Sequence, residues 1–215
     1  MNGKQKPLLS LSSFEREPAT SRTSGRVRPW VTTGCALLAS SSLSLATTLA
    51  AQAANTVYDS GSTTITSPDS ITGLDSYIIG DTGTATVDVV NPGSLSSQYD
   101  LILGNAASGV GTLTTSGAVS LTANRIYVGI DGEGTLTVND GGTITASGSN
   151  RRVLLGWAVG SRATVTLSGA STTMTAYDLL VSNSGHVTMT VSDGATVTTE
   201  DAVYVAYNPY SSGVL

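Results

Sequence analysis

The sequence is poor in charge, and above all in positive charge. Only 12% of its 215 residues are charged. Beyond residue 53 there are four arginines and no lysine against thirteen acidic residues, which gives a net charge of −9. An acidic surface of this kind repels phosphate backbones and anionic lipid headgroups. The composition therefore argues against nucleic-acid binding and against electrostatic docking to a membrane.

Cysteine and histidine each occur once. Cys35 lies near the N-terminus, so residues 54–215 contain no thiol for a disulfide or for nucleophilic chemistry. A zinc site needs several His or Cys ligands, and His186 is the only one in those residues. Asp178 and Asp193 are near His186 in sequence, but nothing makes either one the orienting carboxylate of a triad. We therefore predict no catalytic residue, metal site or cofactor, and we interpret His186 as a surface residue beside a turn.

Residues 1–53 have the organisation of a secretory signal peptide. Residues 1–29 carry six basic and two acidic residues, residues 34–50 are uncharged, and residues 51–53 (AQA) match an A-x-A cleavage pattern. We predict a signal peptide with an extended basic n-region, cleavage after Ala53 and export through the Sec pathway. The alternative, an uncleaved membrane anchor, is disfavoured because the segment is rich in Ser and Thr and short for a spanning helix.

A short aliphatic run that ends in a small residue recurs along the rest of the chain. The closing small residues are 24, 25, 27, 26 and 24 positions apart. A period of this size is typical of stacked supersecondary units rather than of one globular core. The six runs are 77–80 (YIIG), 101–104 (LILG), 126–129 (IYVG), 153–156 (VLLG), 179–182 (LLVS) and 203–206 (VYVA).

The unit over 125–150 shows what each repeat contains. Its aliphatic run is followed by the alternating segment 135–138 (TLTV), a turn at 139–142 (NDGG) and a second alternating segment at 143–146 (TITA). Strict alternation of Thr with aliphatic residues predicts half-buried strands, and Asn, Asp and Gly favour turns. Each unit is therefore expected to hold about three short strands.

Two architectures fit short strands at this spacing. One is an antiparallel sandwich or barrel, and the other is a parallel β-helix in which each strand pairs with its equivalent one period away. Only the second requires successive units to resemble one another. We therefore predict an all-β, right-handed parallel β-helix (β-solenoid) of about six coils of roughly 25 residues over 76–215, with the handedness taken from the crossover rule. Residues 54–75 would form an N-terminal cap or a first irregular coil.

Stacking in register would place equivalent side chains on top of one another. Thr ladders would line the outside, where β-branched residues suit an extended backbone. The predicted inward ladders are Ile126, Val153, Leu179 and Val203; then Val128, Leu155, Val181 and Val205; and then Leu136, Val165 and Met189.

The last unit begins at 203–206, and the sequence stops at Leu215 before a middle strand. An uncapped coil leaves unpaired backbone groups that invite association. We therefore expect repeats that are truncated at the C-terminus, a fragment of a longer protein, and a tendency to associate end to end. Tyr204, Tyr207 and Tyr210 would pack against a next coil in a longer chain.

Residues 132–142 (GEGTLTVNDGG), 154–156 (LLG) and 163–171 (ATVTLSGAS) resemble the repeat associated with type V secretion and PEP-CTERM proteins. The chain departs from that pattern at Ala163 and Ala170, where the family has Gly. The resemblance implies the passenger region of an autotransporter-like protein at the cell surface, in the outer membrane or outside the cell. It also implies anchoring by a C-terminal outer-membrane barrel, for which these 215 residues show no pattern.

Carboxylates are the first candidates for chemistry, because some β-helix enzymes cleave polysaccharides with paired acids. Asp131 and Glu133 share one loop, and Glu200 and Asp201 are adjacent. Asp131, Glu133 and Asp140 also offer oxygen ligands that suit calcium, although the calcium-binding nonapeptide pattern is missing. Most acidic residues lie beside Gly in expected turns, where the local hydrogen bonding of Asp explains them. We therefore predict that the chain is not an enzyme.

The leading functional hypothesis is a structural or adhesive surface element, a β-helical passenger that binds by multivalent weak contacts. Its partners would be host or cell-surface glycans or proteins. The alternatives are a polysaccharide-active β-helix enzyme and an exopolysaccharide-associated matrix protein. Arg151 and Arg152, together with Trp157, form a candidate sugar- or anion-binding patch, and the alternative interpretation is a solvated loop with one exposed aromatic residue.

Overall fold

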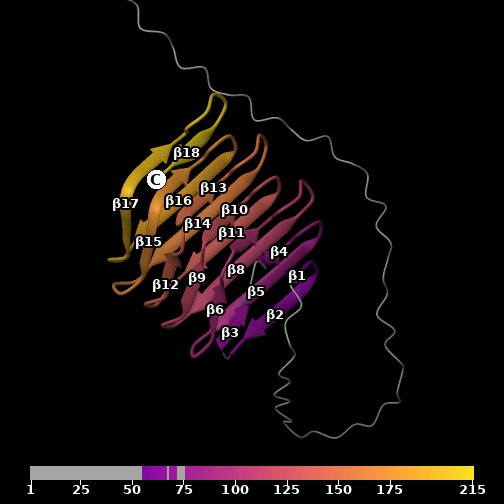
Figure 1. Cartoon of the computed structure of the whole chain (residues 1–215), viewed down its shortest axis with the longest axis vertical. Helices are drawn as coiled ribbons and strands as arrows, with labels where there is room; N and C mark the ends of the chain where they lie inside the picture. Colours follow the sequence, from indigo (N-terminus) through magenta and orange to yellow (C-terminus); the bar gives the residue numbers. More distant parts are fainter. Residues whose placement is uncertain (1–54, 67, 72–75) are drawn as a thin grey trace, which may run out of the picture. The chain divides into compact units, whose positions relative to one another are not determined.

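The computed structural model describes residues 55–66, 68–71 and 76–215. The described part contains eighteen strands and no helix, and all of its strand pairings are parallel. The strands stack as a β-solenoid of about six turns, and the sequence advances steadily from coil to coil in Figure 1. The predicted solenoid of parallel strands is confirmed, and the antiparallel alternative is wrong.

The predicted signal peptide, residues 1–53, lies outside the described residues. In the part that is described, no helix has the length and hydropathy needed to cross a membrane.

Three walls, each built from one strand per coil, enclose the core. The first wall contains the aliphatic runs of the sequence, and the second contains the Thr-rich alternating segments. The first wall consists of β1 (Thr56–Tyr58), β4 (Tyr77–Ile79), β7 (Asp100–Leu103), β10 (Arg125–Val128), β13 (Arg152–Leu155) and the C-terminal halves of β15 (Thr173–Val181) and β17 (Thr196–Val205). The second wall consists of β2 (Gly61–Ile65), β5 (Thr84–Val90), β8 (Val110–Ser116), β11 (Glu133–Val138), β14 (Arg162–Ser168), β16 (His186–Ser192) and β18 (Ser212–Val214). The third wall consists of β3 (Pro68–Ile71), β6 (Ser94–Ser97), β9 (Ser120–Ala123), β12 (Thr143–Ala146) and the N-terminal halves of β15 and β17.

Strands β15 and β17 differ from the others because each runs through the corner between the third and first walls. The pairing of β15 with β17 shifts register between Ala176 and Asp178. An irregularity of this kind bends a strand without ending it. Because β15 pairs with β12 through its first half and with β13 through its second half, it joins the third and first walls into one sheet of eleven strands, while the second wall is a separate sheet of seven.

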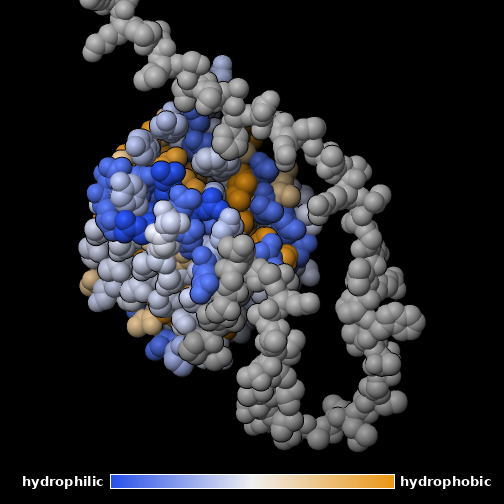
Figure 2. All heavy atoms as spheres, in the orientation of Figure 1, coloured by the Kyte–Doolittle hydropathy of each residue, from blue (hydrophilic) through white to orange (hydrophobic). Residues whose placement is uncertain are grey.

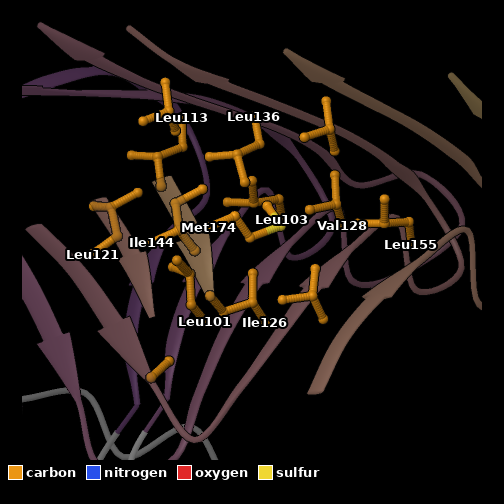
Figure 3. Packing of buried hydrophobic residues seen from close by; sticks show 14 of the residues in the cluster. Leu101, Leu103, Leu113, Leu121, Ile126, Val128, Leu136, Ile144, Leu155 and Met174 are labelled. Carbon is orange, nitrogen blue, oxygen red and sulfur yellow. The ribbon is translucent and has the colours of Figure 1, made fainter. Parts of the chain in front are cut away.

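The core is a column of aliphatic side chains that point inward from all three walls. Leu136 pairs in register with Leu113 on one side and Val165 on the other, and all three are fully buried. Figure 3 shows Leu113 and Leu136 projecting toward side chains of the other walls. Each such burial stabilises the fold by roughly 1.5–3 kcal/mol. Met189 continues the ladder beyond Val165, so this predicted ladder is confirmed.

The two predicted ladders of the first wall are confirmed in register but only partly in burial. Val203 and Val205 lie opposite Leu179 and Val181, as predicted. However, they are 45% and 46% exposed, so their predicted burial is wrong. The reason is that β17 is the last described strand of this wall, and β15 covers it on one side only.

The small residue that ends each aliphatic run forms a tight corner of the coil. In four coils it is a glycine with a positive φ of 59° to 71°. Ser182 and Ala206 occupy the same corner with φ of 73° and 52°, and Ser182 Oγ donates a 2.7 Å hydrogen bond to the carbonyl of Gly185. This left-handed conformation favours glycine, which explains the repeated aliphatic-Gly step. The four glycines are Gly80, Gly104, Gly129 and Gly156.

Residues 55–71 contain one strand of each wall, and these strands pair with β4, β5 and β6 of the next coil. After β1, the carboxylate Oδ1 of Asp59 accepts hydrogen bonds from the backbone N–H groups of Gly83 and Thr82, each at 2.7 Å. The bond from Gly83, followed by those from Thr82, holds the pKa of Asp59 below its usual range.

We predict that Leu136→Ala lowers the free energy of unfolding by about 2–5 kcal/mol, because it opens a cavity inside a fully buried ladder. Thr137→Ala, on the outward face of the same strand, is the matched control and should cost less than about 1 kcal/mol. Urea denaturation of the two variants and the parent measures both values. Equal losses would contradict the assigned inward face.

We predict that Gly129→Ala destabilises the protein more than Gly160→Ala does. Both glycines have positive φ (71° and 86°), so both variants carry backbone strain of about 1 kcal/mol or more. A Cβ at Gly129 would also overlap the backbone carbonyl of Arg162, whereas a Cβ at Gly160 meets no atom within 4 Å. Thermal unfolding of both variants separates the crowding from the strain, and a smaller loss at Gly129 would refute the close packing of the corners.

Candidate functional site

The outward face of the first wall carries the most distinctive side chains of the solenoid. The outward face of the second wall is a Thr ladder in which Thr135 lies between Thr112 and Thr164. Two other ladders run up the first wall instead, one charged and one largely apolar. The charged ladder is Asp100, Arg125, Arg152 and Asp178, and the apolar ladder is Ile102, Tyr127, Leu154, Leu180 and Tyr204.

The charged ladder is organised as two ion pairs. Arg125 donates from Nε and Nη2 to the two carboxylate oxygens of Asp100, at 2.9 and 2.8 Å. Arg152 donates from Nε to Oδ2 of Asp178 at 2.8 Å. The hydrogen bond to Asp100 raises the pKa of Arg125, so this guanidinium remains charged. Because each arginine is bonded to a carboxylate, the two neighbouring guanidinium groups are neutralised by opposite charges.

Asp178 is the most unusual member of this ladder. Its side chain is only 7% exposed. Oδ2 is held by Arg152, but within the described residues no donor contacts Oδ1, which is fully shielded from solvent. A buried acceptor left without a partner costs about 1–3 kcal/mol. This oxygen is therefore a spare acceptor, which a group from outside the chain reaches only when the side chains that cover it move aside.

Aromatic rings lie over and beside the charged ladder. The rings of Tyr127 and Trp157 meet edge to face, with their centroids 6.3 Å apart. The guanidinium carbon of Arg125 lies 5.4 Å from the centroids of both Tyr127 and Tyr99. Burial raises the pKa of Tyr127, so its hydroxyl is protonated at neutral pH. Near β17, Tyr204 and Tyr207 form a second edge-to-face pair at 5.5 Å.

These groups line one open groove of about 410 Å³ along the first wall, here called the first-wall groove. Its volume falls within the range of about 300–1,000 Å³ that is usual for small-molecule sites. The face of the solenoid seen in Figure 2 is mostly hydrophilic, with hydrophobic spheres among the hydrophilic ones. The groove is lined by Arg125 and Tyr127 of β10, Arg152 and Leu154 of β13, Asp178 and Leu180 of β15, Tyr204 of β17, and the loop residues Asn150, Trp157, Asn183 and Tyr207.

The structure separates the three residues of the predicted patch. Arg152 and Trp157 both line the first-wall groove. Arg151 instead contacts Glu200, with Nη1 2.6 Å from Oε1, and its guanidinium lies 5.4 Å from the ring centroid of Tyr177. Two of the three residues of the predicted patch therefore share one groove, and most of the other lining residues come from strands and loops one or two repeats away.

His186 begins β16, where it is exposed and its Nδ1 lies 2.7 Å from Ser212 Oγ. The two carboxylates close to it in sequence have other partners. Asp178 is paired with Arg152, and Asp193 accepts a hydrogen bond from Ser192. The interpretation of His186 as a surface residue at the edge of a strand agrees with this exposed position.

The other carboxylates that sequence reasoning singled out are exposed. Asp131, Glu133 and Asp140 lie at or beside turns, and Glu200 and Asp201 lie on β17. Across residues 55–66, 68–71 and 76–215, no group of three or more His, Cys, Asp or Glu residues is placed to hold a metal ion. Glu200 is engaged by Arg151.

The three C-terminal tyrosines do not behave alike. Tyr204 and Tyr207 pack against each other and line the first-wall groove. Tyr210 is 91% exposed. On the inward side of the same last coil, Val191, Val197 and Val203 help to line an apolar hollow of about 420 Å³.

Comparisons of the chain with protein-family models, with curated proteins and with solved structures return no match.

We predict that Arg152→Ala lowers the free energy of unfolding by about 1–3 kcal/mol, because the buried carboxylate of Asp178 loses its partner. Arg151→Ala is the matched control. Its ion pair with Glu200 is exposed on both sides, so its loss should cost about 0–1 kcal/mol. Adding Asp178→Ala to Arg152→Ala should restore part of the loss. Denaturant titration gives all three values, and equal effects of the two arginines would contradict the burial of Asp178.

Proposed function

We propose that this chain is a β-helical segment of an exported, autotransporter-like surface protein with a structural or adhesive role. The observation that carries the proposal is the continuous stack of coils in register, which presents the same outward ladders along one face. A scaffold of this kind suits a protein that displays binding groups at a cell surface. Residues 54–215 contain no cysteine, so disulfides do not contribute to their stability. Ladders of backbone hydrogen bonds between coils stabilise the fold instead.

The link to autotransporter passengers is supported by the repeat motif at 132–142 and by the signal-like organisation of residues 1–53. In this proposal the Sec pathway exports the chain, which functions at the cell surface or outside the cell.

For partners, we propose cell-surface or host glycans or proteins, which would bind by weak contacts repeated on neighbouring copies. The apolar hollow beside Val203 supports a further, end-to-end contact between copies. Binding is favoured over cleavage because, among the residues that the structure describes, Asp178 is the single acidic one that lines the first-wall groove. A glycosidase needs two carboxylates that face one cleft. Release of reducing ends from glycans by the purified chain would favour the enzyme alternative instead.

We predict that the full chain, fused behind Leu215 to an alkaline phosphatase that needs disulfides, yields active phosphatase in a Gram-negative host. N-terminal sequencing of the exported product should begin at Ala54. A variant with Ala51→Arg and Ala53→Arg should not be cleaved there, because the site requires small residues. An uncleaved product with inactive phosphatase would sink the proposal of export.

A further inference from the structure

We propose that the first-wall groove binds an oligosaccharide, with a sugar ring lying against Trp157, a sugar oxygen bonded to the terminal N–H groups of Arg152, and a sugar hydroxyl that reaches Oδ1 of Asp178 when the side chains covering this oxygen move aside. This inference deepens the proposed adhesive function and rests on it for its biological meaning. It adds a ligand class and assigns the residues that recognise it.

Trp157 provides the flat apolar surface that the C–H face of a sugar ring requires. The residue is 41% exposed although it belongs to a structured groove. Its position is fixed on two sides: the ring meets Tyr127 edge to face, and its backbone carbonyl accepts a 2.9 Å hydrogen bond from Nδ2 of Asn183. A rigid aromatic group loses little conformational entropy when a ligand binds.

Asp178 provides the polar contact that selects a hydroxyl-rich ligand. Its Oδ1 is buried and has no donor among the described residues, whereas Oδ2 is fixed by Arg152. A purely apolar ligand would leave this oxygen unsatisfied and keep the cost of about 1–3 kcal/mol. A sugar hydroxyl that displaces the side chains covering Oδ1 would remove that cost, because a hydroxyl donates one hydrogen bond.

Arg152 provides donors for a sugar oxygen. Its side chain is 49% exposed, and only Nε is used in the contact with Asp178. The two terminal nitrogens of a guanidinium carry four N–H groups that can bind a ring hydroxyl or the carboxylate of an acidic sugar. A hydroxyl acceptor, a fixed arginine fork and an aromatic platform thus meet in one groove.

The balance of charge in the groove also fits a glycan. The guanidinium groups of Arg125 and Arg152 are each paired with a carboxylate, so the groove has no large excess of positive charge. Residues 54–215 carry a net charge of −9. A nucleic acid is therefore disfavoured at this surface, whereas neutral and mildly acidic sugars are tolerated.

The test uses the full chain with Trp30→Phe, because Trp157 is then the only tryptophan and its fluorescence reports on the groove. The probes are neutral cello-, xylo- and manno-oligosaccharides, chito-oligosaccharides and acidic oligogalacturonates, each titrated to millimolar concentration. We expect a saturable change in fluorescence with at least one probe. Absence of saturable binding to any of them would overturn the proposal.

Calorimetry on variants then places the site. Trp157→Ala should weaken binding at least tenfold, and Asp178→Asn should weaken it several-fold, whereas Trp157→Phe should keep most of the affinity. Tyr210→Ala is the matched aromatic control, because Tyr210 is 91% exposed and does not line the groove, and it should bind like the parent. Circular dichroism melting verifies that each variant is folded. Unchanged binding by folded Trp157→Ala or by folded Asp178→Asn would overturn the assignment.

Acidic and neutral sugars distinguish two ways in which Arg152 can contact the ligand. If oligogalacturonates bind best and Arg152→Gln removes that preference, the arginine recognises a carboxylate. If neutral sugars bind equally well, it recognises hydroxyl groups. Export of the phosphatase fusion is measured independently, so a failure of glycan binding leaves the proposed surface role standing, and a failure of export leaves the groove assignment standing.

Discussion

The rest of the structure depends on parallel pairing in register. Each strand bonds to its equivalent one coil away, so every side chain lies about 4.8 Å from its own counterpart. Inside, this spacing favours one unbroken column of aliphatic residues. Outside, it would place like charges side by side unless the sequence varies from coil to coil. The charged ladder does bring two arginines together, Arg125 and Arg152, and it offsets their repulsion by bonding each to an aspartate on the coil beyond it, Asp100 or Asp178.

The inward side of the fold could be predicted from the sequence because the period of the aliphatic runs and the alternation within strands both act locally. The ladder through Leu136 follows from these two patterns alone. Burial at the last coil could not be predicted in the same way. Val203 has the right residue type and the right register, but its exposure depends on what covers the strand. The continuation of β15 through a corner was not predicted either, because no residue pattern indicated that its two halves form one strand.

The groove was harder to predict because neighbours in a solenoid are one period apart rather than adjacent in sequence. Asp178 drew notice only for its closeness to His186, yet its actual partner is Arg152, 26 residues earlier. Arg151 and Arg152 were expected to act together, but only one of them reaches the groove. A usable signal was present at the position just before four of the six aliphatic runs, where two arginines at the repeat spacing are flanked by an aspartate on either side. Reading outward positions as ladders, as was done for inward ones, would have found Arg125 as well.

The groove also lies where the repeat is least regular. The longest interval between successive corner residues, of 27 residues, contains a loop of five residues between β12 and β13. In the preceding coil, the equivalent connection between β9 and β10 is the single residue Asn124. That longer loop supplies Asn150 to the groove. At the other end of β13, backbone hydrogen bonds place Trp157 in the same ladder position as Ile130 and Asn183, so a large ring replaces smaller side chains without breaking the ladder. Since the inward column stabilises the coil, loops and outward positions can change at little cost to stability, and a binding surface can arise on one face of an otherwise uniform stack.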